Sequence, residues 1–205
     1  MSSRWRLLDF NLDICYRLHL SFWCNVNHAE DIQSKMLAKE LPTLENASLF
    51  FVNSDIIIDV VQIEAAVTQA LIHYNDKSSG GMYTRDLATE ILYCLSPNRS
   101  INHALETFGI KASTKELFVG IIYSTKFYQS NDAILQDYLL KIENLIQGTI
   151  YTGSLIQLVK NTDAVCKEYG ITNIERNPIN QSDDPHKSLI ESILGRMASR
   201  DLLRP

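Results

Sequence analysis

The hydrophobic and polar positions of residues 12–23 alternate along the chain. One set of alternate positions is apolar and the other is largely polar: the apolar set is Leu12, Ile14, Tyr16, Leu18, Leu20 and Phe22, and the polar set contains Asp13, Arg17, His19 and Ser21. A period of two places the two sets on opposite faces of a β-strand. The pattern therefore predicts a long, half-buried strand with one apolar and one polar face.

Two further segments are predicted to be extended. Residues 48–58 are rich in aromatic and β-branched side chains, and the pattern breaks near Asn53–Ser54. Residues 115–123 contain the nearly continuous apolar run "LFVGIIY". Because a continuous apolar strand is buried on both faces, this segment is expected in the centre of the sheet.

Helical periodicity, with apolar residues every three or four positions, accounts for most of the remaining chain. The expected helices cover residues 28–38, 59–74, 84–95, 100–109, 134–145 and 163–169, with two more starting near Ser154 and at Asp184–Pro185. The fold class is thus α/β of the α+β kind. We expect a small, mostly antiparallel or mixed sheet of about three or four strands, surrounded by about seven or eight helices.

Local signals mark where several of these helices begin and end. Asp59 with Gln62, and Ser154 with Gln157, have the three-residue spacing of a capping box.

The helical hairpin of residues 84–110 is delimited at both ends and in the middle. Thr84 and Ser100 are predicted N-caps, and Pro97 disfavours helical geometry at the residue before it. Gly109 suits the left-handed position that follows a helix.

The domain organisation follows from the loops. The polar, glycine-containing loop of residues 75–81 is too short to separate domains. Residues 173–187 are polar and contain proline, which predicts a mobile loop. We therefore expect one domain over residues 1–205, with a short N-terminal extension.

Composition narrows the function classes. A formal net charge of −5 argues against a general nucleic-acid coat, because affinity for phosphate backbones depends on Lys and Arg. The four cysteines form no CxxC pair, which argues against a zinc ribbon or a thioredoxin-like motif. With no signal peptide and no membrane-length apolar window, we expect reduced thiols, no membrane contact, and a location in the nucleus and cytoplasm.

The sequence contains no recognisable catalytic motif. Gly80–Gly81 is followed by Met82 rather than by the Lys of a phosphate-binding loop. The five histidines have no metal-ligand spacing, and Asp86 and Glu90, four residues apart, favour a solvated helix face. We therefore expect neither an enzyme nor a bound metal or cofactor.

The final helix favours a binding role. Its apolar positions Ile190, Ile193, Leu194 and Met197 are candidates for contact with a partner, although docking on the chain's own core is an equally good interpretation. A glycine in the middle of a helix, such as Gly195, lowers the stability of that helix. Its presence would be explained if another backbone came close to the helix there. Three arginines near the end of the helix, Arg196, Arg200 and Arg204, are interpreted first as complements to its macrodipole and second as phosphate contacts.

The hairpin sequence "MYTRDLATEILYCLSPNRSINHALETFGI" (residues 82–110) resembles the signature of the PRPK-binding protein family, the kinase-binding subunits of the KEOPS (EKC) complex. The resemblance rests on Met82, Thr84-Arg85, Leu87, Glu90-Ile91, Leu95-Ser96-Pro97, Ile101, Ala104-Leu105 and Phe108-Gly109-Ile110. Weaker similarity extends to "ESILGRMASRDLL" near the C-terminus.

This resemblance implies a non-catalytic subunit that binds the small atypical kinase and, indirectly, the other KEOPS subunits. It also implies help in recruiting tRNA by its 3′ CCA end for threonylcarbamoyladenosine modification. Tyr83 stands where the family has a basic residue, so tRNA contact should be weaker. We expect Lys77, Tyr83 and Arg85 to make that contact by stacking and charge, although a surface ion pair is an equal interpretation of Arg85.

Two other functions stay open at this stage. An adapter could bind the kinase without contacting RNA. A small enzyme of unrecognised type would be indicated by a cleft that holds a residue with a strongly perturbed pKa.

Overall fold

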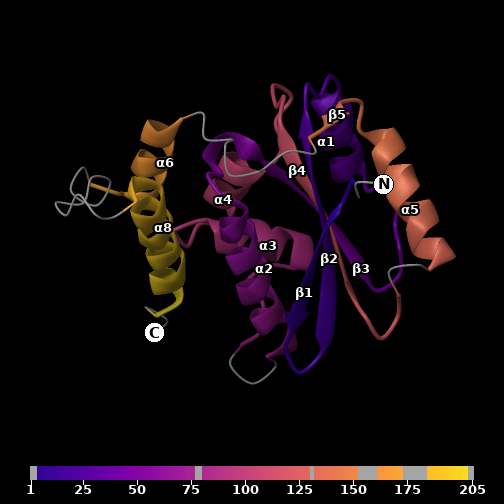
Figure 1. Ribbon diagram of the computed structural model, residues 1–205, viewed down its shortest axis with the longest axis horizontal. Coiled ribbons are helices and arrows are strands. Elements are labelled where there is room, and N and C mark those ends of the chain that lie inside the picture. The colour runs from indigo at the N-terminus through magenta and orange to yellow at the C-terminus, as the bar shows by residue number, and fades with distance from the viewer. Residues whose placement is uncertain (1–3, 77–79, 130–131, 152–160, 173–183, 203–205) are drawn as a thin grey trace. The chain divides into compact units, whose positions relative to one another are not determined.

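The computed structural model describes residues 4–76, 80–129, 132–151, 161–172 and 184–202 (Figure 1). The fold is α+β, as predicted. The chain divides into two compact units: unit 1 contains Met1–Asn53 and Ile110–Gly153, and unit 2 contains Ser54–Gly109 and Ser154–Pro205. The single domain expected over residues 1–205 stays a prediction.

Unit 1 contains the sheet, which has five strands among the described residues. The strands are β1 (Arg6–Asn11), β2 (Cys15–Cys24), β3 (Ala47–Asn53), β4 (Leu117–Ser124) and β5 (Thr149–Ile150). Their order is β1-β2-β4-β3, with β5 also on β2, and every pairing is antiparallel. This confirms three predicted strands and the interior position of β4.

Strands β1 and β5 were not predicted. β5 has only two residues, too few to show a period. β1 is an edge strand in which Leu7 and Leu8 are adjacent, so its apolar positions do not alternate.

The prediction that β2 is half-buried is wrong, because both of its faces are buried from Leu18 to Trp23. Helices α1 (Ala29–Ala38) and α5 (Ala133–Leu145) are both labelled in Figure 1, and they supply residues to the core cluster that contains Trp23. The polar residues on the Trp23 face of β2 bond to other side chains. His19 Nε2 lies 2.9 Å from the Tyr123 hydroxyl, and Trp23 Nε1 donates to Ser21 Oγ at 2.9 Å.

Unit 2 contains the remaining helices of the described chain. They are the 3-10 helix η1 (Ser54–Ile56), α2 (Val60–Asn75), α3 (Leu87–Leu95), α4 (Ile101–Phe108), α6 (Thr162–Tyr169) and α8 (Pro185–Leu202). The capping box of Asp59 and Gln62 is confirmed at the start of α2. Within the described chain, no helix combines the length and hydrophobicity needed to cross a bilayer.

The hairpin α3–α4 follows its predicted course with two corrections. Ser100 caps α4 as expected, but Asp86 rather than Thr84 caps α3, by accepting from Thr89 N at 2.9 Å. Gly109 is not left-handed, since its φ is −72°. Glycine is required there for a steric reason, because a Cβ atom would lie 2.3 Å from the Leu105 carbonyl oxygen.

The C-terminal predictions are tested in part. Helices α6 and α8 occur where expected, with Pro185 as the first residue of α8. Ser154, Gln157 and Arg204 lie outside the described residues, and so do residues 173–183 of the predicted loop.

Candidate functional site

Glu90 lies at the centre of a buried polar network in unit 2. Its side chain is fully buried, although the sequence pattern placed it on a solvated helix face with Asp86. Glu90 Oε1 lies 2.8 Å from His73 Nδ1, and Oε2 accepts from both the backbone N and the Oγ1 of Thr84 at 2.8 Å. The carboxylate therefore connects α2, α3 and the segment that leads into α3.

Glu90 is held in its charged form. Burial raises its pKa most strongly, but hydrogen bonds from His73, from the hydroxyl and backbone of Thr84, and from the backbone of Tyr83 outweigh burial and lower the pKa below its ordinary value. A charged carboxylate only accepts hydrogen bonds, so His73 Nδ1 must be the donor in the pair. The network is consequently a fixed ionic cluster in the folded chain.

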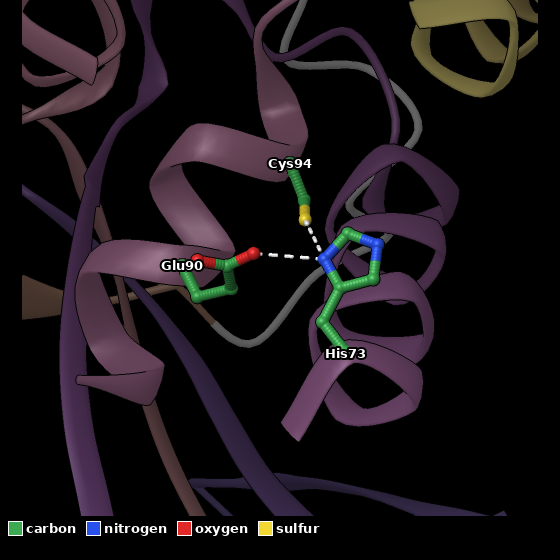
Figure 2. Close-up of side chains that lie close together, drawn as sticks. All are labelled: His73, Glu90 and Cys94. Atoms are coloured by element: carbon green, nitrogen blue, oxygen red, sulfur yellow. Dashed lines mark hydrogen bonds and ion pairs between the residues drawn. The ribbon is translucent and has the colours of Figure 1, made fainter. Parts of the chain in front are cut away.

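Cys94 completes a group of three potential metal ligands (Figure 2). Figure 2 shows His73 on α2 pointing at Glu90 and Cys94, which both come from α3. The Cys94 sulfur lies 3.9 Å from His73 Nδ1, and the ligand atoms all fall within 4.8 Å of one another. Nitrogen, oxygen and sulfur ligands of this kind suit zinc.

A neighbouring cation argues against a metal in this group. Arg200 Nη2 lies 3.7 Å from the Cys94 sulfur, so a second positive charge would be repelled. His73 and Glu90 are already paired at hydrogen-bond distance, and a metal ion would have to displace the proton between them. Among the described residues, the group is best explained as a structural hydrogen-bond network.

Arg200 itself has a role that the sequence did not predict. It is 3% exposed and donates to the carbonyl oxygens of Tyr93 and Ser96, the latter at 3.0 Å. Its guanidinium also lies 4.3 Å from the centroid of the Tyr93 ring. Arg200 therefore caps the C-terminus of α3 and fixes α8 to it, rather than complementing the dipole of its own helix.

The predicted RNA-binding residues lie beside this network. Tyr83 is 39% exposed, and its ring contacts those of His73 and Tyr93 with centroid separations of 5.6 and 5.1 Å. Arg85 is exposed and forms no hydrogen bond or ion pair with the described residues. Both interpretations of Arg85, RNA contact and surface ion pair, stay predictions. Lys77 lies outside the described residues.

The predicted partner-binding residues divide into two groups. Ile193 and Met197 are 0% and 2% exposed, so they are buried in the folded chain and offer no exposed surface to a partner. Ile190 and Leu194 are partly exposed. A Cβ atom on Gly195 would meet nothing within 4 Å, so the close backbone expected there does not come from the described chain.

Sequence reasoning missed His73, Glu90, Cys94 and Arg200 as members of one network. The signal was incomplete, because Glu90 stands six residues after Thr84 within the recognised motif, but its other partners are far apart in the chain. Burial of a carboxylate cannot be inferred from helical spacing alone.

Comparison with known proteins gives a consistent result. Residues 23–201 match the family model described as kinase binding protein CGI-121. The EKC/KEOPS complex subunit CGI121 of Kluyveromyces lactis is 30% identical over 51% of this chain and 59% of its own length. The EKC/KEOPS complex subunit TPRKB of Danio rerio is 25% identical over 74% of this chain and 75% of its own length.

A third relative extends the match. The EKC/KEOPS complex subunit cgi121 of Neurospora crassa is 24% identical over 91% of this chain and 93% of its own length. The family is described by what it binds and not by a reaction, in agreement with the expectation of a non-catalytic protein. Because the family model covers the hairpin, the buried network and α8, this chain belongs to the CGI-121 family of kinase-binding proteins.

Proposed function

We propose that this chain is the kinase-binding subunit of a KEOPS-type complex and helps to recruit tRNA for threonylcarbamoyladenosine modification. Family membership and the names of the relatives support the first part. The exposed Tyr83 and Arg85 support the second.

The kinase proposal rests on one observation: part of the apolar face of α8 is buried and part of it is exposed. Ile193 and Met197 anchor the helix inside unit 2, while Ile190 and Leu194 retain exposed apolar surface beside them. Partly exposed apolar side chains on an anchored helix are suited to bind a hydrophobic groove.

The test is complex formation with the kinase subunit of the same KEOPS complex, measured by size-exclusion chromatography and calorimetry. Leu194→Glu and Ile190→Glu should abolish a one-to-one complex while leaving the thermal unfolding of the free chain close to wild type. Ser192→Glu is the matched control, because a position two residues away lies on the opposite flank of the helix. Normal binding by both glutamate variants would refute the proposed surface.

For tRNA, the single-stranded 3′ end fits the chemistry of the Tyr83 segment. The rings of His73 and Tyr93 hold Tyr83 while part of its own ring stays exposed to stack on a base. Arg85 offers a guanidinium that no described residue engages. A site that consists of one aromatic ring and one guanidinium needs few basic residues, so it is compatible with the net charge of −5.

Tyr83→Ala and Arg85→Glu should each weaken binding of a labelled single-stranded RNA ending in CCA. Loss of one base stack corresponds to roughly 1–3 kcal/mol, or about 5- to 150-fold in affinity. Lys126→Glu, at an exposed position in unit 1, makes the same charge change as Arg85→Glu and should have little effect. Equal affinity for all variants would favour an adapter that binds the kinase without contacting RNA.

A further inference from the structure

The segment that carries Tyr83 and Arg85 is attached to unit 2 through one buried carboxylate. Glu90 accepts hydrogen bonds from the backbone N–H groups of Tyr83 and Thr84 and from the Thr84 hydroxyl. Thr84 Oγ1 also lies 3.0 Å from the carbonyl oxygen of Asp86, and its one proton is shared between that oxygen and Glu90. The backbone of Tyr83 and Thr84 is thereby fixed relative to α3, chiefly through Glu90.

These contacts require an acceptor oxygen at position 90. Glu90 is surrounded by donors, from His73 on one side and from the Tyr83–Thr84 backbone and the Thr84 hydroxyl on the other. A glutamine would keep an acceptor oxygen for the Thr84 donors, because a neutral His73 can move its proton to Nε2 and accept from the glutamine NH₂ group at Nδ1. A leucine removes both acceptor oxygens, so it is the replacement that releases the segment.

His73 acts on the same segment in two ways. Its Nδ1 donates to Glu90 at 2.8 Å, which orients the carboxylate. Its ring also contacts the Tyr83 ring in an edge-on arrangement, with an interplanar angle of 75°. Both members of the pair thus limit the positions that Tyr83 can adopt.

We propose that Glu90 and His73 are positioning residues that preorganise Tyr83 and Arg85 for a single-stranded RNA end. This inference rests on the proposed RNA contact, although neither Glu90 nor His73 is expected to touch the RNA. A free segment would have to be ordered on binding, whereas the fixed segment is already ordered. Preorganisation therefore increases affinity without adding a contact.

The experiment combines RNA binding with amide hydrogen exchange on the full chain. Glu90→Leu should lower affinity for a labelled single-stranded RNA ending in CCA by roughly tenfold, because two side chains must then be ordered on binding. Kinase binding should be unchanged, and the Thr84 amide should lose its protection from exchange. A protected Thr84 amide in a folded Glu90→Leu variant would overturn the proposal whatever the RNA result.

A second pair of variants avoids altering the buried carboxylate. Thr84→Val removes the hydroxyl donor and retains the shape, so RNA affinity should fall severalfold, while Thr84→Ser should restore it. If Tyr83→Ala weakens RNA binding but Thr84→Val and a folded Glu90→Leu do not, positioning is refuted and the RNA site stands. If Tyr83→Ala has no effect, the RNA site itself is refuted, and the positioning proposal with it.

Discussion

Replacing Arg200 by Met tests whether α8 is fixed to the end of α3 by a single buried side chain. Arg200 donates to the carbonyl oxygens of Tyr93 and Ser96 and lies over the Tyr93 ring. Methionine retains much of the apolar stem and removes every donor. The Ser96 oxygen then loses the only partner that it has among the described residues.

The magnitude follows from these contacts. An unsatisfied buried carbonyl costs about 1–3 kcal/mol, and the second bond, to Tyr93, is lost as well. The contact of the guanidinium with the Tyr93 ring adds about 1 kcal/mol. We expect Arg200→Met to lower the free energy of unfolding by about 2–5 kcal/mol. The stability of Arg200→Lys should lie between those of Arg200→Met and wild type, because one ammonium group cannot make all the hydrogen bonds of the planar guanidinium.

Urea unfolding gives the free energy, and hydrogen exchange shows whether α8 loses protection. Arg196→Met is the control, since Arg196 is exposed and its hydrogen bond to the Gly170 carbonyl oxygen is long, at 3.5 Å. That control should stay within about 0.5 kcal/mol of wild type. The reasoning is refuted if Arg200→Met changes stability no more than Arg196→Met and α8 remains protected.

Further measurements test three individual positions. Gly195→Ala should stabilise the free chain by about 1 kcal/mol in thermal unfolding, because its Cβ would meet nothing, whereas Gly195→Trp should weaken kinase binding if the kinase lies close to α8. Burial, with a smaller effect of Arg17, lowers the pKa of His19 from 6.5 to about 4. At a pH between these two values, the unfolded chain therefore binds more protons than the folded chain. Stability should therefore be full above pH 6.5 and fall by about 3 kcal/mol as the pH drops towards 4, and His19→Gln should remove this slope. Tyr169→Phe removes the hydroxyl that donates to the Leu95 carbonyl oxygen at 2.8 Å and should cost about 1–3 kcal/mol in urea unfolding.

The sequence predicted elements whose causes are local. The capping box of Asp59, the cap at Ser100 and the apolar run of β4 each depend on residues within a few positions of one another, and all three are found in the structure. β2 shows the limit of such reasoning. Its alternation was recognised, but the burial of its polar face depends on residues of α1 and α5 that are distant in sequence.

The candidate site shows the same limit more sharply. The hairpin motif identified Tyr83 and Arg85 as neighbours of a helix start, and the structure places them there. It did not reveal that Glu90 is buried, because a glutamate four residues after Asp86 has the spacing of a solvated face. A donor cluster formed by α2 and the segment before α3 stabilises the carboxylate in its charged form. Three-dimensional proximity decides the state of this residue.

The break at Pro97 explains why unit 2 depends on distant partners. Proline ends α3, so the carbonyl groups of Leu95 and Ser96 have no partner within the helix, while the Tyr93 carbonyl accepts from the Ser96 backbone N–H. The Leu95 oxygen accepts from Tyr169 of α6, and the Tyr93 and Ser96 oxygens accept from Arg200 of α8. These partners are 74 to 107 residues away along the chain. A locally encoded helix end therefore creates the polar groups to which both C-terminal helices attach, and through Arg200 it fixes the helix that carries Ile190 and Leu194.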